Sequence, residues 1–262
     1  MDQDSYVPPP KEDKEPPEAL PESDRPPFAV WTLLALIVIA FMIQGDICYS
    51  RSGTGHDLSV TSLIAAGGLS VELVHNGEWF RLLTANFLHG SFSHLFFNAV
   101  ALYLANRLEI MIGAAWFGAM FILSGLGGSL LVLVSGSDAA VTIGASGAIL
   151  GVFAAQCVLA YACYPDESPL RRGLANRAWS VLLPTLLSFG TGRDGSSLSI
   201  AAHFGGAITG ALLGLVFAIF WRPEEMEKPH AEWAAWTING LAAAVVLYAI
   251  FGPLMREGCV WF

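Results

Sequence analysis

Long uncharged runs of apolar residues constrain this chain more than any other feature. Four runs contain no Asp, Glu, Lys or Arg, and each is close to the ~20 residues with which an α-helix crosses a bilayer: 28–44, 114–134, 200–221 and 234–253. Only 13% of all residues are charged, whereas soluble domains carry about 25%. The sequence therefore predicts an all-α membrane protein that crosses the bilayer several times.

Seven membrane-spanning helices are expected when weaker apolar segments are included. Two of the weaker segments carry features unusual in a span, because one contains His94 and Asn98 and another contains Pro184. The seven expected spans are 28–44, 91–108, 114–134, 142–163, 176–190, 200–221 and 234–253.

The first 27 residues differ from the rest of the chain in composition. They hold eight acidic residues, three basic residues and eight of the 14 prolines, so they cannot bury enough apolar surface to fold. We expect a disordered tail.

With the N-terminus in the cytoplasm, nine of the 13 basic residues fall in inner segments, which favours that orientation. A plasma membrane is the expected location.

One connector, residues 46–90, is much longer than the others. It contains apolar and amphipathic pieces, and Trp79 and Phe80 stand beside Arg81, a combination that suits an anchor at the membrane interface. We expect this loop to lie partly in the outer leaflet. A disulfide between Cys48 and Cys259, which would both face outside, is a further possibility that the sequence leaves open.

Polar side chains inside membrane helices are expensive and therefore indicate function. His94 and Asn98 stand four residues apart on one helical face. Ser146 begins the fourth span within Gly-Ala-Ser-Gly, and His203 lies near the start of the sixth. All of them fall near the outer ends of their helices, so they could converge at one depth.

Each of these residues also has a structural interpretation, because Ser, His and Asn commonly hydrogen-bond between membrane helices. For Ser146 and His203, nearby glycines favour the catalytic interpretation over the structural one. Gly206, Gly210 and Gly214 form one narrow face below His203, and the fourth span offers small residues in return. Close packing of these faces could bring Ser146 within hydrogen-bond reach of His203, as a serine nucleophile and its base require. His94 and Asn98 could then donate to an oxyanion.

Four motifs, in order, resemble those of the rhomboid family. Gly144-Ala145-Ser146-Gly147 is similar to the GxSG nucleophile motif, and Ala202-His203-Phe204-Gly205-Gly206 to the AHxxG motif of the base. The segment from His94 to Asn98 resembles the HxxxN motif, and the segment from Glu78 to Thr84 resembles the Trp-Arg stretch of the first loop. The resemblance covers residues 28–221, and it implies a six-helix core to which this chain adds a seventh helix.

The resemblance implies an intramembrane serine protease that acts through a Ser–His dyad. Ser146 would attack, His203 would accept its proton, and His94, Asn98 and the Ser146 backbone N–H would bind the oxyanion. His89 matches an outer histidine that is structural or water-retaining in the family. The expected partners are single-pass transmembrane substrates and the lipid bilayer, with no metal, cofactor or nucleic acid. The span 176–190 would gate substrate entry, and the loop 191–199 would cap the site.

Two positions depart from the family pattern. Leu150 stands where an aromatic residue often packs against the base, and Glu109 matches a family glutamate only across a one-residue gap. For Glu109 we expect either an interfacial charge beside Arg107 or a structural bond into the first loop.

The expected organisation has three parts: a tail (1–27), a catalytic core (28–221), and a linker with the seventh helix (222–262). Two other functions fit the polar residues. A rhomboid-like module could bind membrane helices without cutting them, although it would not need a matched nucleophile and base. A small transporter would usually show internal repeats, and none is found.

Overall fold

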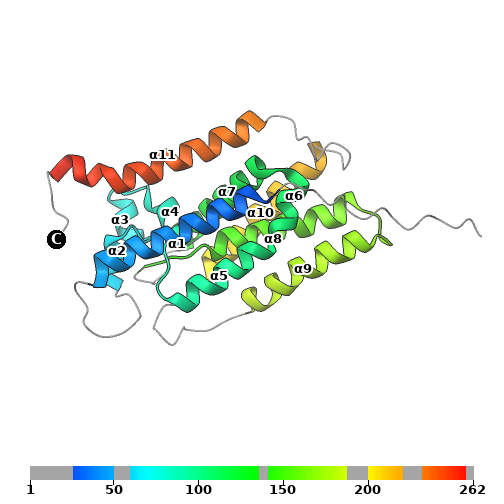
Figure 1. Cartoon of the computed structure of the whole chain (residues 1–262), viewed down its shortest axis with the longest axis horizontal. Coiled ribbons are helices and arrows are strands. Elements are labelled where there is room, and N and C mark those ends of the chain that lie inside the picture. The colour runs from blue at the N-terminus through cyan, green and yellow to red at the C-terminus, as the bar shows by residue number, and fades with distance from the viewer. Residues whose placement is uncertain (1–25, 50–59, 136–140, 188–199, 221–231, 258–262) are drawn as a thin grey trace, which may run out of the picture.

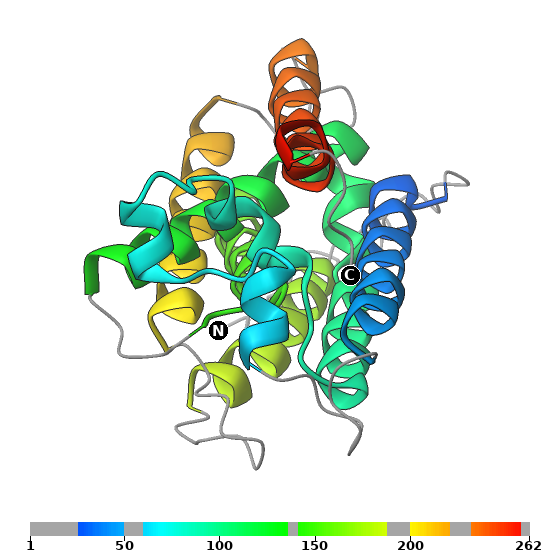
Figure 2. The same ribbon diagram turned by 90° about the vertical axis from the view of Figure 1, so that its left-hand side faces the viewer.

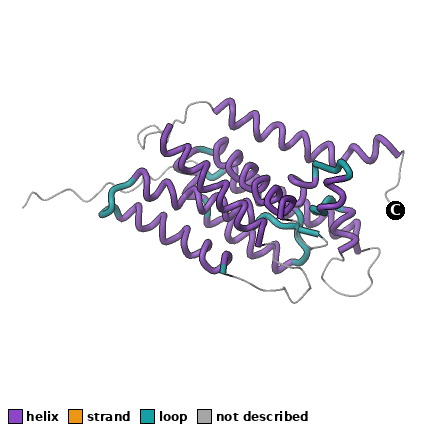
Figure 3. The backbone as a smooth tube through the Cα atoms, turned by 180° about the vertical axis from the view of Figure 1, so that it is seen from behind, coloured by secondary structure: helices purple, strands orange, loops and turns teal. Residues whose placement is uncertain are grey.

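The computed structural model describes residues 26–49, 60–135, 141–187, 200–220 and 232–257, and in these ranges the chain is helical apart from short loops (Figure 1, Figure 3). One isolated antiparallel bridge joins Leu69 and Thr142. The helices are α1 (Phe28–Tyr49), α2 (Val60–Ala65), α3 (Val71–His75), α4 (Arg81–Thr84), the 3-10 helix η1 (Ala85–Phe87), α5 (Phe92–Leu104), α6 (Asn106–Ile112), α7 (Ala114–Ser135), α8 (Ser146–Cys163), α9 (Pro169–Leu186), α10 (Ile200–Phe220) and α11 (Glu232–Glu257).

Four helical segments in the described ranges are long and apolar enough to cross a membrane. They are the consecutive pair α5–α6, which together cover Phe92–Ile112, and the helices α7, α8 and α10. The apolar part of α1, Phe28–Gln44, is shorter. These segments confirm an all-α membrane protein, while the total of seven spans stays a prediction. Residues 1–25 of the acidic tail, the loop 191–199, most of the linker before α11, and Cys259 lie outside the described residues.

The second and fifth spans differ from the sequence-based expectation. The segment predicted as 91–108 reaches Ile112 and is interrupted at Ala105. The helix predicted as 176–190 begins seven residues earlier, at Pro169. Ser168 caps it by accepting a hydrogen bond from the Arg171 N–H, and proline is well suited to the first helical turn. Because α9 carries Arg171, Arg172 and Arg177, it is not among the four apolar spans.

Helix α8 occupies the centre of the bundle and packs against α7, α9 and α10. Its approach to α10 is close enough for the two backbones to touch. A Cβ added to Gly206 would collide with the Gly147 carbonyl oxygen, and one added to Gly210 would collide with that of Gly151. Between helices in a bilayer, packing of small residues replaces the hydrophobic effect as a driving force. These glycines therefore fix the distance between α8 and α10.

Glu109 holds the beginning of α1. Its two carboxylate oxygens accept hydrogen bonds from the Ala29 and Val30 N–H groups, at 2.7 and 2.8 Å. The first N–H groups of a helix lack intrahelical partners and favour negative charge, which explains why a carboxylate is buried here. Both expectations for Glu109 are therefore wrong, because its partner is neither Arg107 nor the first loop.

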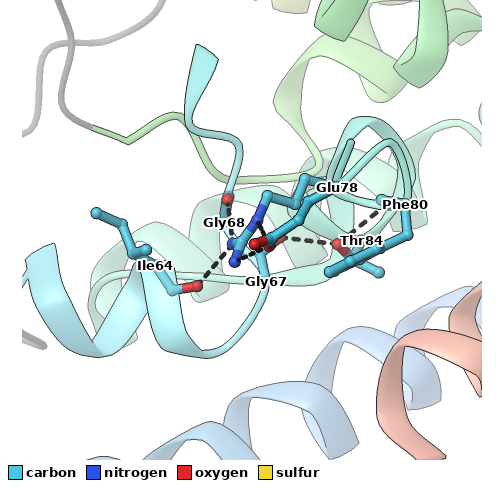
Figure 4. A network of polar contacts seen from close by, with 7 residues as sticks. Ile64, Gly67, Gly68, Glu78, Phe80 and Thr84 are labelled. Carbon is cyan, nitrogen blue, oxygen red and sulfur yellow. Dashed lines mark hydrogen bonds and ion pairs between the residues drawn. The ribbon is translucent and has the colours of Figure 1, made fainter. Parts of the chain in front are cut away.

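Arg81 organises the first loop from inside. Its guanidinium donates to the carbonyl oxygens of Ile64 and Gly68, at 2.6 and 2.8 Å, and pairs with the Glu78 carboxylate at 2.6 Å (Figure 4). The Arg81 side chain is buried. The expectation that it belongs to an interfacial anchor is wrong for this residue, because its guanidinium points into the loop and binds carbonyl groups there. Trp79 is exposed.

Helix α11 lies on the side of the bundle opposite α9 (Figure 1, Figure 2). It packs along α7 and also contacts α4 in the first loop. Asn239 donates its side-chain amide to the Ala115 carbonyl at 2.9 Å, and it fits there because Gly118 has no side chain to displace it. This partly buried hydrogen bond fixes the register between α11 and α7.

Substitution of Gly210 by alanine should destabilise the protein, because the added methyl would displace the Gly151 backbone. Overpacking of this kind costs about 1–3 kcal/mol. Gly240→Ala in α11 is the matched control, since no atom lies within 4 Å of its added Cβ. The melting temperature in detergent should fall for Gly210→Ala and not for Gly240→Ala. Equal melting temperatures would contradict the close contact of α8 and α10.

Candidate functional site

Ser146 is the first residue of α8, and the segment before it is fixed to the first loop. Thr142 and Leu69 exchange two backbone hydrogen bonds of 2.9 and 3.0 Å, and the Gly144 N–H donates to the Ala85 carbonyl at 2.9 Å. Gly144 has a φ of +113°, a conformation that residues other than glycine rarely adopt. Bonds to the first loop and this glycine turn together determine where Ser146 lies.

His203 lies in the first turn of α10 and faces Ser146. The Ser146 Oγ and the His203 Nε2 are 2.8 Å apart, a hydrogen-bond distance, although the residues are 57 positions apart in the chain. His203 is buried, whereas Ser146 is partly accessible. Gly147 and Gly206, which follow these two residues on their helices, are in backbone contact, and this contact sets the distance between Ser146 and His203.

His94 and Asn98 reach the same place from α5. Ser91 caps this helix by accepting a hydrogen bond from the His94 N–H at 3.3 Å. A Cβ built on Gly144 would lie 2.7 Å from the His94 Nε2 and 3.7 Å from the Asn98 Nδ2. Both nitrogens therefore stand over the turn that leads into Ser146. The Asn98 Nδ2 is buried and has no hydrogen-bond partner among the described residues.

The N-terminus of α8 adds donors of its own. No side chain caps this helix, and the first N–H groups of any α-helix lack intrahelical partners. The turn at Ser146 therefore combines a hydroxyl, an imidazole acceptor, two side-chain nitrogens and backbone N–H groups. Such a set can attack a carbonyl carbon and stabilise the negative charge that develops on its oxygen.

His89 lies beside this group but does not join it directly. Its ring meets that of His94 edge to face, with centroids 5.0 Å apart. Burial and, to a smaller extent, the neighbouring His94 lower the pKa of His89 to about 3. The Phe87 carbonyl has a weaker, opposite effect on this pKa, and it falls short of hydrogen-bond geometry to the ring. His89 is therefore neutral at physiological pH. Between pH 6.5 and about 3, His89 binds a proton more readily in the unfolded state than in the folded one. The free energy of unfolding therefore decreases as the pH falls through that window.

All four candidate residues from the sequence are thus brought together, and Leu150 is buried in the core below them. Two contributors were missed. Thr142 was taken as the first residue of the fourth span but pairs with the first loop, and Gln44 was taken as the end of the first apolar run. A glutamine closing such a run was the available signal for a buried polar contact. In the described part of the chain, no three His, Cys, Asp or Glu side chains cluster closely enough to hold a metal ion.

Comparison with known proteins places these elements in a family. The model of the rhomboid domain matches residues 76–220, which include all four candidate residues. RHOMBOID-like protein 5 of Arabidopsis thaliana is 33% identical over 171 residues, covering 63% of this chain and 52% of the relative. The putative rhomboid protease YdcA of Bacillus subtilis is 34% identical over 146 residues, covering 55% of this chain and 69% of the relative.

A third relative matches almost the whole chain. The rhomboid protease GluP of Bacillus subtilis is 27% identical over 240 residues, covering 91% of this chain but only 44% of GluP. The chain therefore spans about half the length of two of these three relatives. Because the domain model matches more than half of the chain and includes the helices that carry Ser146 and His203, this protein belongs to the rhomboid family.

Proposed function

We propose that this chain is a serine-type intramembrane endopeptidase, which hydrolyses a peptide bond within or beside a transmembrane helix of another membrane protein. The observation that carries the proposal is the 2.8 Å contact between the Ser146 Oγ and the His203 Nε2 at the N-terminus of α8. Relatives named as rhomboid proteases, including AarA of Providencia stuartii, support it.

In the proposed reaction, the Ser146 Oγ attacks the carbonyl carbon while the His203 Nε2 takes the hydroxyl proton. The tetrahedral oxyanion is stabilised by the His94 and Asn98 side chains and by the Ser146 backbone N–H. His203 then donates its proton to the leaving amine, which leaves an acyl group on Ser146. Water, activated by the same imidazole, hydrolyses this ester. No carboxylate in the described ranges hydrogen-bonds to His203, so the proposed unit is a dyad.

The substrate would be a single-pass helix that enters from the lipid beside α9. Polar contacts tie the first half and the middle of α9 to the bundle: Gln156 donates to the Leu174 carbonyl, Arg177 to that of Leu104, and Trp179 to the Tyr161 hydroxyl. Leu183, in its second half, and Leu187, directly after its end, are exposed. Since a helix already hydrogen-bonds its carbonyls, substrates with residues that weaken the helix should be cleaved faster. We propose a plasma membrane with the N-terminus inside.

The dyad is tested by cleavage of a reconstituted single-pass substrate. Ser146→Ala and His203→Ala should each lose activity by about 10⁴-fold or more, as removal of a member does in other serine hydrolases. Ser180→Ala and His75→Ala are matched controls, because both residues are exposed and lie on α9 and α3, which carry none of the four candidate residues. Reactivity toward a fluorophosphonate probe should be lost with Ser146 as well.

The outcomes separate protease from binding module. Cleavage that survives Ser146→Ala would refute the proposed nucleophile. A folded wild-type protein that neither cleaves nor reacts with the probe would instead favour a module that binds membrane helices, a function compatible with the relatives named only as rhomboid-like.

The proposed oxyanion donors have their own test. His94→Ala and Asn98→Ala should each lower kcat by about 10²–10³-fold, the usual effect of losing one such donor, with a much smaller change in KM. His75→Ala and Asn76→Ala are the matched controls, because they replace a histidine and an asparagine on the surface of the first loop. Both should leave kcat unchanged. A fall in kcat of less than tenfold for both site variants would contradict their assignment.

A further inference from the structure

Gln44 is a buried glutamine in α1 that binds the backbone of the segment leading into α5. Its side-chain Nε2 donates to the His89 carbonyl at 2.8 Å, and its Oε1 accepts from the His89 N–H at 3.3 Å. Gln44 is only 1% exposed and His89 is fully buried. A primary amide that pairs with both polar groups of one residue acts like a neighbouring peptide strand, and it satisfies groups that would otherwise be costly to bury.

His89 transmits this restraint to the site. It lies between η1 and α5, outside any helix, so its position is not fixed by a helical hydrogen-bond ladder. Its ring packs edge to face on that of His94, with an interplanar angle of 68°, which is a favourable arrangement for two aromatic rings. The His94 Nε2 in turn stands over Gly144. Any shift of His89 therefore changes where the His94 ring can point.

The other end of α1 is also fixed. Glu109 accepts the Ala29 and Val30 N–H groups, and Gln44 lies 14 residues beyond Val30, or about 21 Å along a helix. Because α1 is a rigid helix that is held at its start, the position of Gln44 along the helix axis is fixed. The amide can therefore act as a fixed support and need not follow the movement of the loop.

We propose that Gln44 is a positioning residue for the oxyanion site: through the His89 backbone and ring it holds His94 in the orientation that donates to the substrate oxygen. This inference rests on the proposed function. Gln44 does not touch the reacting atoms, and its contribution should fall on the transition state and leave substrate binding alone. Displacement of a catalytic group by about 1 Å can cost about 10²-fold in rate.

The test replaces Gln44 by methionine, which keeps the length and apolar stem but removes both hydrogen bonds. Gln156→Met is the matched control, because Gln156 is also a fully buried glutamine and also donates to a backbone carbonyl, that of Leu174, at 2.9 Å. Gln156 lies ten residues after Ser146 on α8, about 15 Å away along the helix. For each variant, kcat, KM, the rate of fluorophosphonate labelling and the melting temperature are measured.

Gln44→Met should lower kcat and the labelling rate by about tenfold to a hundredfold, with KM within about twofold of wild type. Gln156→Met should lose similar thermal stability with less than a threefold change in labelling. If Gln44→Met does not fold, Gln44→Asn, which withdraws the amide by one methylene, is judged by the same criterion.

The outcomes distinguish this inference from the proposed function beneath it. A folded Gln44 variant whose kcat and labelling rate match those of wild type, or fall no further than those of Gln156→Met, overturns the positioning role alone. A wild-type protein that the probe does not label, or labels equally after Ser146→Ala, overturns the proposed function.

Discussion

The close contact between the backbones of α8 and α10 is the constraint on which the rest of the structure depends. Glycines on α10 lie against carbonyl oxygens of α8, and Gly128 and Gly147 both approach the Ala202 carbonyl. Their Cα–H groups point toward these oxygens, a weak interaction worth about 0.5–1 kcal/mol each. Since lipid is as apolar as leucine, larger side chains would gain little here and would separate the helices. Ser146 and His203 reach hydrogen-bond distance because nothing larger than hydrogen stands between their helices just below.

Buried polar side chains do a second task, which is to join segments that apolar packing cannot align. Glu109 holds the start of α1, Gln44 its other end and Arg81 the first loop, and the partly buried Asn239 holds α11. In each case the partner is a backbone group of a distant segment. An unpaired buried polar group costs about 1–3 kcal/mol, so each of these contacts disfavours any other alignment.

The sequence predicted the helical membrane fold and the group of Ser146, His203, His94 and Asn98, because their signals are local: uncharged runs, a four-residue spacing and a glycine face. Sequence reasoning failed where the determining contact is distant. Arg81 beside two aromatic residues looks interfacial, yet its carbonyl partners lie 13 and 17 positions away. The partners of Glu109 are 79 and 80 positions away. The start of α9 was missed for a different reason, since its capping serine and arginines make that turn too polar for a hydropathy-based boundary.

The separation of Ser146 and His203 along the chain has a consequence for biosynthesis. α8 precedes α10, and the segment before Ser146 already has its partners in the first loop when α8 is made. Under the proposed mechanism, a partly synthesised chain would carry an assembled nucleophile without its base until the last helix of the matched domain enters the membrane. The order of translation would thus keep the enzyme latent while unfolded helices, its own included, are still being inserted around it.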